Sequence, residues 1–306
     1  MNTAEYWLQH CAEEMNLADL HFGHGTDNSQ DEAAWMLLHI LNAPLDGSFQ
    51  DWDRQLDDDQ ETRLLELLQR RINERVPLAY LTGTARFCGL DFKVTDQTLV
   101  PRSPIAELIL NGFAPWLKNG SLEQGRALDM CTGGGCIAIA MAEYMPEMKV
   151  DAVDISAATL EIAQQNVIDH DKVNQVNLIQ SDLFDELKES QYDLIVSNPP
   201  YVSAAVFEQL PAEYLAEPSA GLVCGEDGLD IVLKILDASP HYLKKHGILV
   251  VEVGESAETL MELLPGVAFL WLEFDHGGDG VFLLDYEQLQ ASHADVKAVL
   301  EQRQYV

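Results

Sequence analysis

The hydrophobic positions in the first part of the chain recur at helical spacing. Between Glu32 and Leu41 the apolar residues fall on one face of a helix, and turn residues follow it. A second segment with this pattern extends from about Asp57 to Asn73. The apolar positions of the two segments are Ala33, Met36, Leu37, Ile40, Leu41, Leu64, Leu65, Leu67, Leu68 and Ile72. The pattern predicts a small helical domain over residues 1–75, which we interpret as a substrate-recognition domain.

The pattern changes after this helical region, where apolar and polar residues alternate over residues 80–87 and 90–94. Such alternation around glycine is typical of two paired strands, so we predict a β-hairpin linker over residues 76–103. Ser103 is then expected to cap a helix that extends to about Trp116.

Farther along the chain, short apolar segments alternate with helical ones. The predicted strands are 126–130, 149–154, 176–180, 192–197, 247–253, 267–273 and 280–284. Helices fill the intervals, for example 156–170 and 229–245. Short apolar strands separated by helices are typical of a parallel sheet that is covered on both faces. Only a turn separates the last two strands, so one of them runs antiparallel. The pattern predicts an α/β domain over residues 104–306, with a doubly wound, mostly parallel, seven-stranded sheet and an antiparallel final hairpin.

Length and composition fit this organisation. At 306 residues the chain exceeds one average domain, as two folded units require. The first residues have neither a basic start nor a long apolar run, so we expect no signal peptide, no membrane anchor and a cytoplasmic protein. The five scattered cysteines suit a reducing compartment and fit no common zinc pattern, so we predict no metal.

Charge is the unusual bulk property of the chain. It has 51 acidic and 18 basic side chains, a formal net charge of −33. The favoured interpretation of this charge is solubility or adaptation to an environment; the functional alternative is that such a surface repels phosphate backbones and attracts basic proteins. Both interpretations argue against a bare nucleic-acid substrate, and neither identifies a partner.

Residues 128–140 (LDMCTGGGCIAIA) are predicted to form a strand, a glycine-rich turn and the start of a helix. Three consecutive glycines let the backbone bend sharply and let a ligand approach closely. In a doubly wound sheet, this first turn lies where nucleotide-type ligands bind. The turn lacks the G-x-G-x-x-G spacing that binds a pyrophosphate, which favours S-adenosylmethionine over a dinucleotide.

Two acidic residues end the next two predicted strands. Asp154 is placed to accept hydrogen bonds from both ribose hydroxyls, although it is also suited to cap the helix that begins at Ser156. Asp182 is placed to meet the adenine amino group, and Leu183 to cover the adenine ring. Together with the glycine-rich turn, these residues favour the cofactor interpretation.

The segment Asn198-Pro199-Pro200-Tyr201 follows the fourth predicted strand. Successive prolines fix the backbone and leave the preceding carbonyls free to accept hydrogen bonds. An amide nitrogen is a poor nucleophile because its lone pair is delocalised into the carbonyl. If Asn198 and Pro199 each accept one of its N–H bonds, the nitrogen is held toward a methyl sulfonium and becomes pyramidal more easily. Tyr201 is suited to stack on a planar target. Alone, the same segment also fits a structural turn.

With residues 131–136, Asp154 and residues 198–201 in this arrangement, the chain resembles the class I S-adenosylmethionine-dependent methyltransferases. More closely, it resembles the bacterial glutamine-N5 methyltransferases that modify release factors or a ribosomal protein, and the resemblance covers nearly the whole chain. The Asn-Pro-Pro-Tyr motif is shared with adenine-N6 DNA methyltransferases and some guanine-N2 rRNA enzymes, so alone it indicates only a planar nitrogen target.

Two segments distinguish the branches of that family. Residues 101–107 read Pro-Arg-Ser-Pro-Ile-Ala-Glu, where the release-factor branch usually has Pro-Arg-Pro-Asp-Thr-Glu. This version, and the Gly-Gly-Asp-Gly-Val-Phe ending at 277–282, resemble the branch that acts on the third protein of the large ribosomal subunit, a basic target. Cys131 and Leu183 depart from the release-factor branch, which has glycine and often tryptophan there.

The motifs and the resemblance together imply the site residues. The expected contacts of S-adenosylmethionine, and of its product S-adenosylhomocysteine, are Cys131, Thr132, Gly133, Gly134, Gly135, Asp154, Asp182, Leu183 and Asn198. The expected catalytic residues are Asn198, Pro199 and Tyr201. The expected contacts of the target glutamine are Asn198, Pro199, Pro200 and Tyr201, and Arg102 is expected to orient either the target or the linker.

The resemblance thus implies methyl transfer to a glutamine side-chain amide in a large-subunit ribosomal protein. A release-factor glutamine methyltransferase is the first alternative, and the Ser103-Pro104 pair argues against it. An adenine or guanine methyltransferase would need a basic channel, which 18 basic residues make difficult to build. A ribosome-assembly factor that binds the cofactor without catalysis is disfavoured by the intact tetrapeptide.

Overall fold

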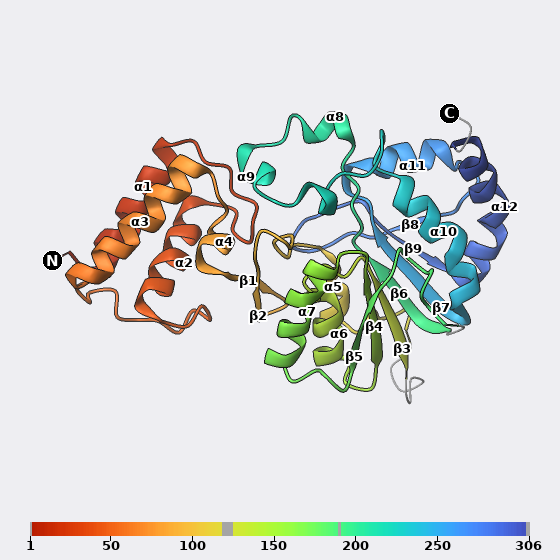
Figure 1. Ribbon diagram of the computed structural model, residues 1–306, viewed down its shortest axis with the longest axis horizontal. Helices are drawn as coiled ribbons and strands as arrows, with labels where there is room; N and C mark the ends of the chain where they lie inside the picture. The colour runs from red at the N-terminus through yellow and green to blue at the C-terminus, as the bar shows by residue number, and fades with distance from the viewer. Residues whose placement is uncertain (1, 118–124, 189–190, 304–306) are drawn as a thin grey trace.

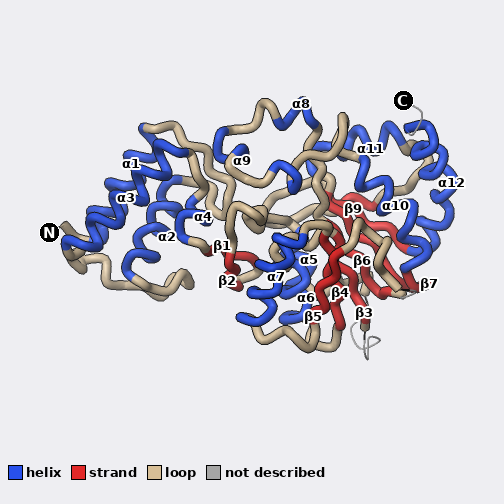
Figure 2. Tube along the Cα trace, in the orientation of Figure 1, coloured by secondary structure: helices blue, strands red, loops and turns tan. Residues whose placement is uncertain are grey.

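The structure, a computed structural model, describes residues 2–117, 125–188 and 191–303. Helices of the N-terminal region gather at one end of the molecule, and the large sheet with its covering helices lies at the other end (Figure 1). Coloured by secondary structure, the strands of the large sheet form one layer between helices (Figure 2). Within the described ranges, no helix combines the length and the apolar character that a membrane crossing requires.

The N-terminal region is helical, as predicted. Its helices are α1 (Ala4–Leu17), α2 (Ser29–Leu41), α3 (Asp58–Glu74) and α4 (Leu78–Thr82). The first three begin at side-chain caps, in which Thr3, Asn28 and Asp57 accept hydrogen bonds from backbone N–H groups of the first turn. Their apolar faces form one separate core, which includes Trp7, Met15, Met36, Leu37, Ile40, Leu56 and Leu64.

The linker contains the expected hairpin in a shorter form. Strands β1 (Thr84–Phe87) and β2 (Leu90–Lys93) pair antiparallel. Residues 80–82 belong to α4 instead of a strand, because Leu78 and Ala79 are buried and Gly83 ends the helix in the left-handed conformation. Helix α5 (Ile105–Leu110) ends well before Trp116, since the backbone turns left-handed directly after Asn111.

The sheet confirms the predicted fold class. Its strands are β3 (Arg126–Met130), β4 (Lys149–Asp154), β5 (Val176–Gln180), β6 (Tyr192–Ser197), β7 (Leu243–Glu252), β8 (Leu270–Trp271) and β9 (Val281–Asp285). The spatial order is β5-β4-β3-β6-β7-β9-β8, and β9 runs in the opposite direction to the other strands of this sheet. Strand β7 begins earlier than predicted because Leu243 already pairs with Tyr192 across a register shift. For the same reason, the helix before it ends at Tyr242.

Successive strand residues point to opposite faces, and each face has its own core. Helices α5, α6 (Cys136–Tyr144) and α7 (Ala157–Asp169) cover one face. Helices α10 (Asp230–Tyr242), α11 (Ala257–Leu263) and α12 (Tyr286–Arg303) cover the other face. Along β6, for example, Leu194 and Val196 pack in the first core and Ile195 in the second, as a doubly wound sheet requires.

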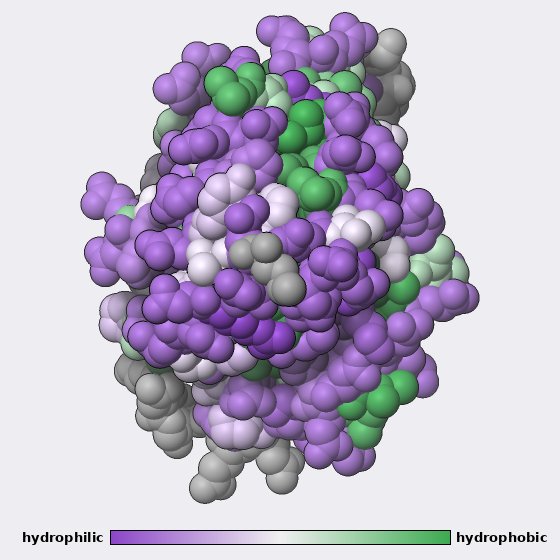
Figure 3. Space-filling model, turned by 90° about the vertical axis from the view of Figure 1, so that its left-hand side faces the viewer, coloured by the Kyte–Doolittle hydropathy of each residue, from purple (hydrophilic) through white to green (hydrophobic). Residues whose placement is uncertain are grey.

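The segment between β6 and α10 leaves the sheet. We call residues 202–225 the insert; it contains α8 (Ala204–Phe207), α9 (Ala212–Leu215) and the 3-10 turn η1 (Ser219–Gly221). Helix α9 lies beside the N-terminal helices (Figure 1), where its side chains bond to residues of that domain. Seen from the N-terminal end, the surface is mostly hydrophilic, with a few separate hydrophobic groups (Figure 3).

Candidate active site

Two cavities open at the carboxyl ends of the central strands. The first, which we call the cofactor cavity, has a volume of about 320 Å³, within the range of small-molecule sites. Its lining residues include Cys131, Gly133, Asp154, Asp182, Leu183, Asn198 and Pro200. The second, which we call the target cavity, is lined by residues that include Arg102, Ser103, Cys131, Thr132, Gly133, Gly134, Asn198, Pro199 and Tyr201. Cys131, Gly133 and Asn198 line both, so the two cavities adjoin.

The glycine-rich turn has the conformation that its sequence requires. Cys131, Gly133 and Gly135 all have positive φ, at 62°, 56° and 83°. A Cβ at Gly133 would have no neighbour within 4 Å, so this stretch of backbone is open to a ligand. Gly135 lies outside both cavities, because it packs against Ala163 of α7. At Cys131 a side chain occupies a left-handed position that costs about 1 kcal/mol outside glycine.

Asp154 combines the two roles that its position suggested. Its Oδ1 accepts from the backbone N–H of Ser156 and its Oδ2 from that of Gly133, both at 2.9 Å. Burial raises the pKa of this carboxyl group. Each carboxylate oxygen can accept a further bond, which is what a ribose diol needs. With exposed Asp182 and half-buried Leu183 at the end of β5, the cavity has the acceptors and the apolar wall that an adenosine group fits.

Asn198 follows the last residue of β6. Its Nδ2 donates to the backbone carbonyl of Arg102 at 3.4 Å, which sets the orientation of the side-chain amide. The oxygen Oδ1, on the opposite side of that amide, is then the available acceptor. The two prolines that follow line different cavities: Pro199 lines the target cavity and Pro200 the cofactor cavity.

Tyr201 is held by a buried acid that the sequence did not reveal. Its hydroxyl donates to Oε1 of Glu252 at 2.9 Å, and the Ser103 hydroxyl donates to Oε2 at 2.5 Å. Glu252 is only 5% exposed, and this burial raises its pKa to about 7. The sequence signal that could have identified Glu252 was its position as an acidic residue at the end of the apolar run of β7. The backbone of Tyr201 is also fixed, since its carbonyl accepts from the Ser256 hydroxyl at 3.0 Å.

Two glycines leave room for Tyr201. A Cβ at Gly254 would lie 2.7 Å from the tyrosine ring, and one at Gly228 would lie 2.0 Å from the tyrosine carbonyl oxygen. Neither distance is compatible with a side chain. The ring and the backbone of Tyr201 are thus enclosed by residues far from it in the sequence.

A second buried acid lies beneath the glycine-rich turn. Asp129 is fully buried, and its Oδ2 accepts from the Thr132 hydroxyl at 2.5 Å and from the Ala138 N–H at 3.1 Å. No described residue bonds to its Oδ1. Burial raises the pKa of Asp129 to about 7. Thr132 was expected to contact the cofactor, but its hydroxyl donates to buried Asp129 instead.

Comparison with known proteins decides the family. The ribosomal protein uL3 glutamine methyltransferase of Xanthomonas campestris is 50% identical over 289 residues, which are 94% of this chain and 92% of that protein. Two proteins of the same name from Xylella fastidiosa strains are 47% identical over 297 residues, 97% of this chain and 94% of theirs. The chain belongs to this family of glutamine methyltransferases.

Domain-level and structural matches agree with this assignment. The family model described as "Methyltransferase small domain" matches residues 111–225 of this methyltransferase, and "PrmC N-terminal domain" matches residues 18–83. Among solved structures, the hMettl16 catalytic domain in complex with a MAT2A 3'UTR hairpin aligns with a TM-score of 0.51 and 17% identity. It covers 75% of this chain and 82% of that one, and it shows the fold alone.

In this methyltransferase the Arg102 side chain contacts the insert. Its Nη2 lies 2.7 Å from Oε1 of Glu217, its Nη1 lies 3.1 Å from Oε2, and the guanidinium lies over the ring of Tyr214. Sequence reasoning left open whether Arg102 orients the target or the linker. The structure joins its side chain to the insert, while its carbonyl contacts Asn198 and part of the residue lines the target cavity.

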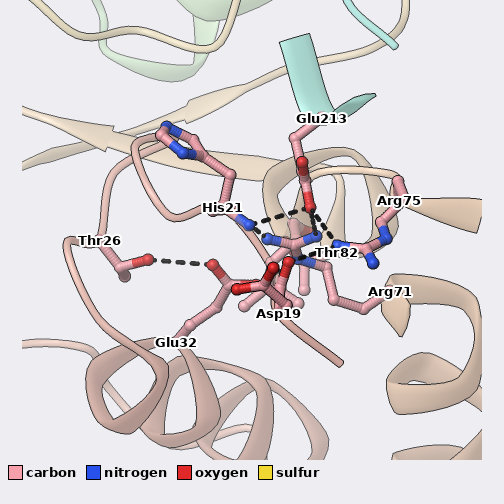
Figure 4. Close-up of polar contacts among 9 residues, drawn as sticks. Asp19, His21, Thr26, Glu32, Arg71, Arg75, Thr82 and Glu213 are labelled. Atoms are coloured by element: carbon pink, nitrogen blue, oxygen red, sulfur yellow. Dashed lines mark hydrogen bonds and ion pairs between the residues drawn. The ribbon is translucent and has the colours of Figure 1, made fainter. Parts of the chain in front are cut away.

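The insert also docks on the N-terminal domain of this methyltransferase through a buried charge cluster, which we call the junction (Figure 4). Glu213 of α9 accepts from the His21 N–H at 3.2 Å, from Arg71 at 3.2 Å and from Arg75 at 3.3 Å. Arg71 is 1% exposed and also donates to Glu32 at 2.5 Å. This junction was not predicted, because its members are separated by up to about 190 positions.

Metal ligands are not grouped anywhere in the part of the chain that the structure describes. Within it, no set of three or more His, Cys, Asp or Glu side chains is arranged to hold a metal ion.

Proposed function

We propose that this methyltransferase transfers a methyl group from S-adenosylmethionine to the side-chain amide nitrogen N5 of a glutamine in ribosomal protein uL3, a basic protein of the large subunit, in the cytoplasm. The observation that supports this most directly is the position of Asn198, which lines both cavities and thus stands where a methyl donor and an acceptor would meet. The names of the relatives supply the substrate.

The cofactor cavity suits the methyl donor. When bound there, S-adenosylmethionine supplies an electrophilic methyl group on a sulfonium. We assign the ribose hydroxyls to Asp154 and the adenine to Asp182 and Leu183, with the rest of the molecule against the open backbone at Gly133. These assignments rest on the donor and acceptor character of the cavity.

The target cavity suits a planar amide. Oδ1 of Asn198 and the carbonyl of Pro199 each accept one N–H of the target glutamine, so the nitrogen presents its lone pair to the methyl group. The N–C bond forms as the C–S bond breaks, and the bonding pair remains on sulfur. The alkylated nitrogen is strongly acidic and releases a proton to water, so no strong base is needed. Tyr201, held by Glu252, forms a wall for the planar group.

We further propose that residues 1–75 recognise the protein substrate, that residues 76–103 are the linker and that residues 104–306 carry catalysis. The separate core of α1–α3 supports the first assignment. Free nucleic acid is not a substrate in this proposal. The 51 acidic side chains outnumber the 18 basic ones, and Arg71, Arg75 and Arg102 are paired with acids, which disfavours binding of a phosphate backbone.

The test is transfer of labelled methyl from S-adenosylmethionine to purified uL3, a release factor and RNA. Mass spectrometry then locates the modified residue. We expect label on a glutamine of uL3, reduced by about 100- to 1,000-fold in Asn198→Ala because a preorganised acceptor is lost. Because Asn198 also lines the cofactor cavity, the Kd of S-adenosylhomocysteine is measured in parallel, so that lost binding is separated from lost transfer, and exposed Asn174→Ala is the matched control. Label on the release factor alone, or on RNA alone, would contradict the proposal.

A further inference from the structure

Glu217 is a buried carboxylate at which three segments of the chain meet. Its side chain has no exposed surface. It lies 2.7 Å from Nε2 of His24 in the N-terminal domain. It also binds two nitrogens of Arg102 and accepts from the Val100 N–H at 3.1 Å, and both residues belong to the linker. Glu217 itself belongs to the insert, so one side chain joins insert, linker and N-terminal domain.

The linker position matters because it orients the catalytic amide. The Nδ2 of Asn198 donates to the Arg102 carbonyl, and this contact distinguishes the two ends of the amide. If the amide were reversed, Nδ2 would face the target, and a donor would meet the N–H donors of the glutamine. The two bonds from Arg102 to Glu217, and the bond from Val100 to the same acid, fix this part of the linker on both sides of Pro101.

We propose, on the basis of the proposed function, that Glu217 is a positioning residue for the target amide: it holds Arg102, whose carbonyl sets the orientation of Asn198, and it ties that orientation to the N-terminal domain through His24. The path is continuous through three contacts: His24 to Glu217 at 2.7 Å, Glu217 to Arg102 at 2.7 Å, and the Arg102 carbonyl to Asn198 at 3.4 Å. The N-terminal domain, which carries His24 and is proposed to recognise the substrate, is thereby held in a fixed position relative to the acceptor oxygen Oδ1 of Asn198.

The insert contains a matched control for this role. Glu213 is also buried, at 2% exposed, and it also binds arginines and a residue of the N-terminal domain. Its hydrogen bonds and ion pairs among the described residues go to the N-terminal domain and not to the linker, and it lines neither cavity. Comparing Glu213 with Glu217 separates two roles. Both acids dock the insert on the N-terminal domain, whereas Glu217 also positions the amide of Asn198.

The experiment measures methylation of uL3 by the full chain as wild type, Glu217→Gln and Glu213→Gln. For each protein it determines kcat, KM, the Kd of S-adenosylhomocysteine and Tm. For Glu217→Gln we expect kcat to fall about 10- to 100-fold, since displacement of a reacting group by about 1 Å has this effect. We expect KM and the Kd to stay within about threefold. For Glu213→Gln we expect a lower Tm and a kcat within about twofold of wild type.

An unchanged kcat in Glu217→Gln would overturn the inference, and so would equal falls of kcat in both variants. If Glu217→Gln does not fold, Arg102→Lys replaces it, because lysine keeps the charge but cannot bridge both carboxylate oxygens. Because Arg102 also lines the target cavity, a lower kcat with KM within about threefold in Arg102→Lys supports positioning, and a wild-type kcat overturns it. Wild-type protein that places no label on uL3 overturns the proposed function and the inference with it. An active wild type with an unaffected variant overturns the inference alone.

Discussion

Two regions of this molecule bury carboxyl groups, and the surroundings shift the pKa of these groups in opposite directions. At the active-site floor, which we define as Asp129 and Glu252, the bonded partners are hydroxyls and a backbone N–H. Burial raises the pKa of both acids to about 7 because these partners do not offset it. In the insert, at the junction and beside it, burial also acts on Glu213 and Glu217, but hydrogen bonds from the backbone, His24 and arginines outweigh it, so both pKa values lie below the ordinary range.

The difference follows from what each region has to do. Docking one domain on another benefits from the fixed, forked hydrogen bonds of arginine, and the chain places Arg71, Arg75 and Arg102 there although it has only 18 basic residues. The active-site floor positions hydroxyl and backbone groups around a neutral amide. Asp129 and Glu252 hold these groups by accepting hydrogen bonds from neutral donors, so among the described residues no cation is in direct contact with either acid.

The largest expected effect comes from breaking the junction. Arg71→Met would leave Glu32 and Glu213 buried without their main cation, which costs about 3–5 kcal/mol of unfolding free energy. Urea unfolding measures this loss. The control is its neighbour Arg70→Met, whose pair with Glu74 is roughly half exposed and contributes at most about 0.5 kcal/mol. Equal losses in the two variants would mean that the buried charges at the junction contribute no more than a surface pair.

The pH dependence of stability should separate the regions next. A carboxyl whose folded pKa is raised contributes stability that is present below the unfolded pKa and is lost as pH rises through the folded value of about 7. For Asp129 this loss is about 1.4 kcal/mol per pH unit between pH 5 and pH 7. Asp129→Asn should therefore show a smaller fall of the urea midpoint over this interval than wild type. Parallel profiles would contradict the raised pKa, and exposed Asp96→Asn is the control.

The junction should show the opposite sign in acid. The lowered pKa of Glu213 contributes stability above the unfolded pKa, and this is lost as pH falls through the folded value. The stability difference between wild type and Glu213→Gln should therefore be largest near neutral pH and should shrink toward pH 3. A difference that grows in acid would show that the arginines do not favour the ionised form.

The smallest effect is expected at the hydroxyls of the active-site floor. Ser103→Ala removes one bond to Glu252, worth about 1 kcal/mol, and should lower kcat about fivefold. Tyr201→Phe removes the other bond to the same acid. Because both hydroxyls share Glu252, the effects of the two changes should not add in the double variant. Strict additivity in kcat would show that the acid does not couple them.

The parts predicted from the sequence were those with local patterns. The ranges of β3, β4, β5 and β6 were predicted to the residue, since each is an apolar run bounded by turn residues. The same runs placed Asp154 and Asn198 at strand ends, and both line the cofactor cavity. Strand β8 was predicted too long because its pairing depends on only two residues.

The parts that escaped prediction depend on distant contacts. Nothing near Glu217 in the sequence indicates its bond to His24, and nothing near Glu252 indicates its bond to Ser103. The side-chain direction of Thr132 was equally hidden, because it is set by Asp129 beneath the turn. Local sequence therefore specifies which elements meet at the site, while tertiary contacts specify how each side chain in it is held.

The packing of glycines against Tyr201 has a genetic consequence. Any missense change at Gly228 or Gly254 introduces a Cβ where the tyrosine already lies, at 2.0 Å and 2.7 Å respectively. Such alleles should inactivate the enzyme as surely as a change in the tetrapeptide itself, while the protein still carries an intact Asn-Pro-Pro-Tyr sequence. A screen for loss-of-function alleles should therefore recover hits at these two codons, and a survey of natural variants restricted to residues 198–201 would overlook them.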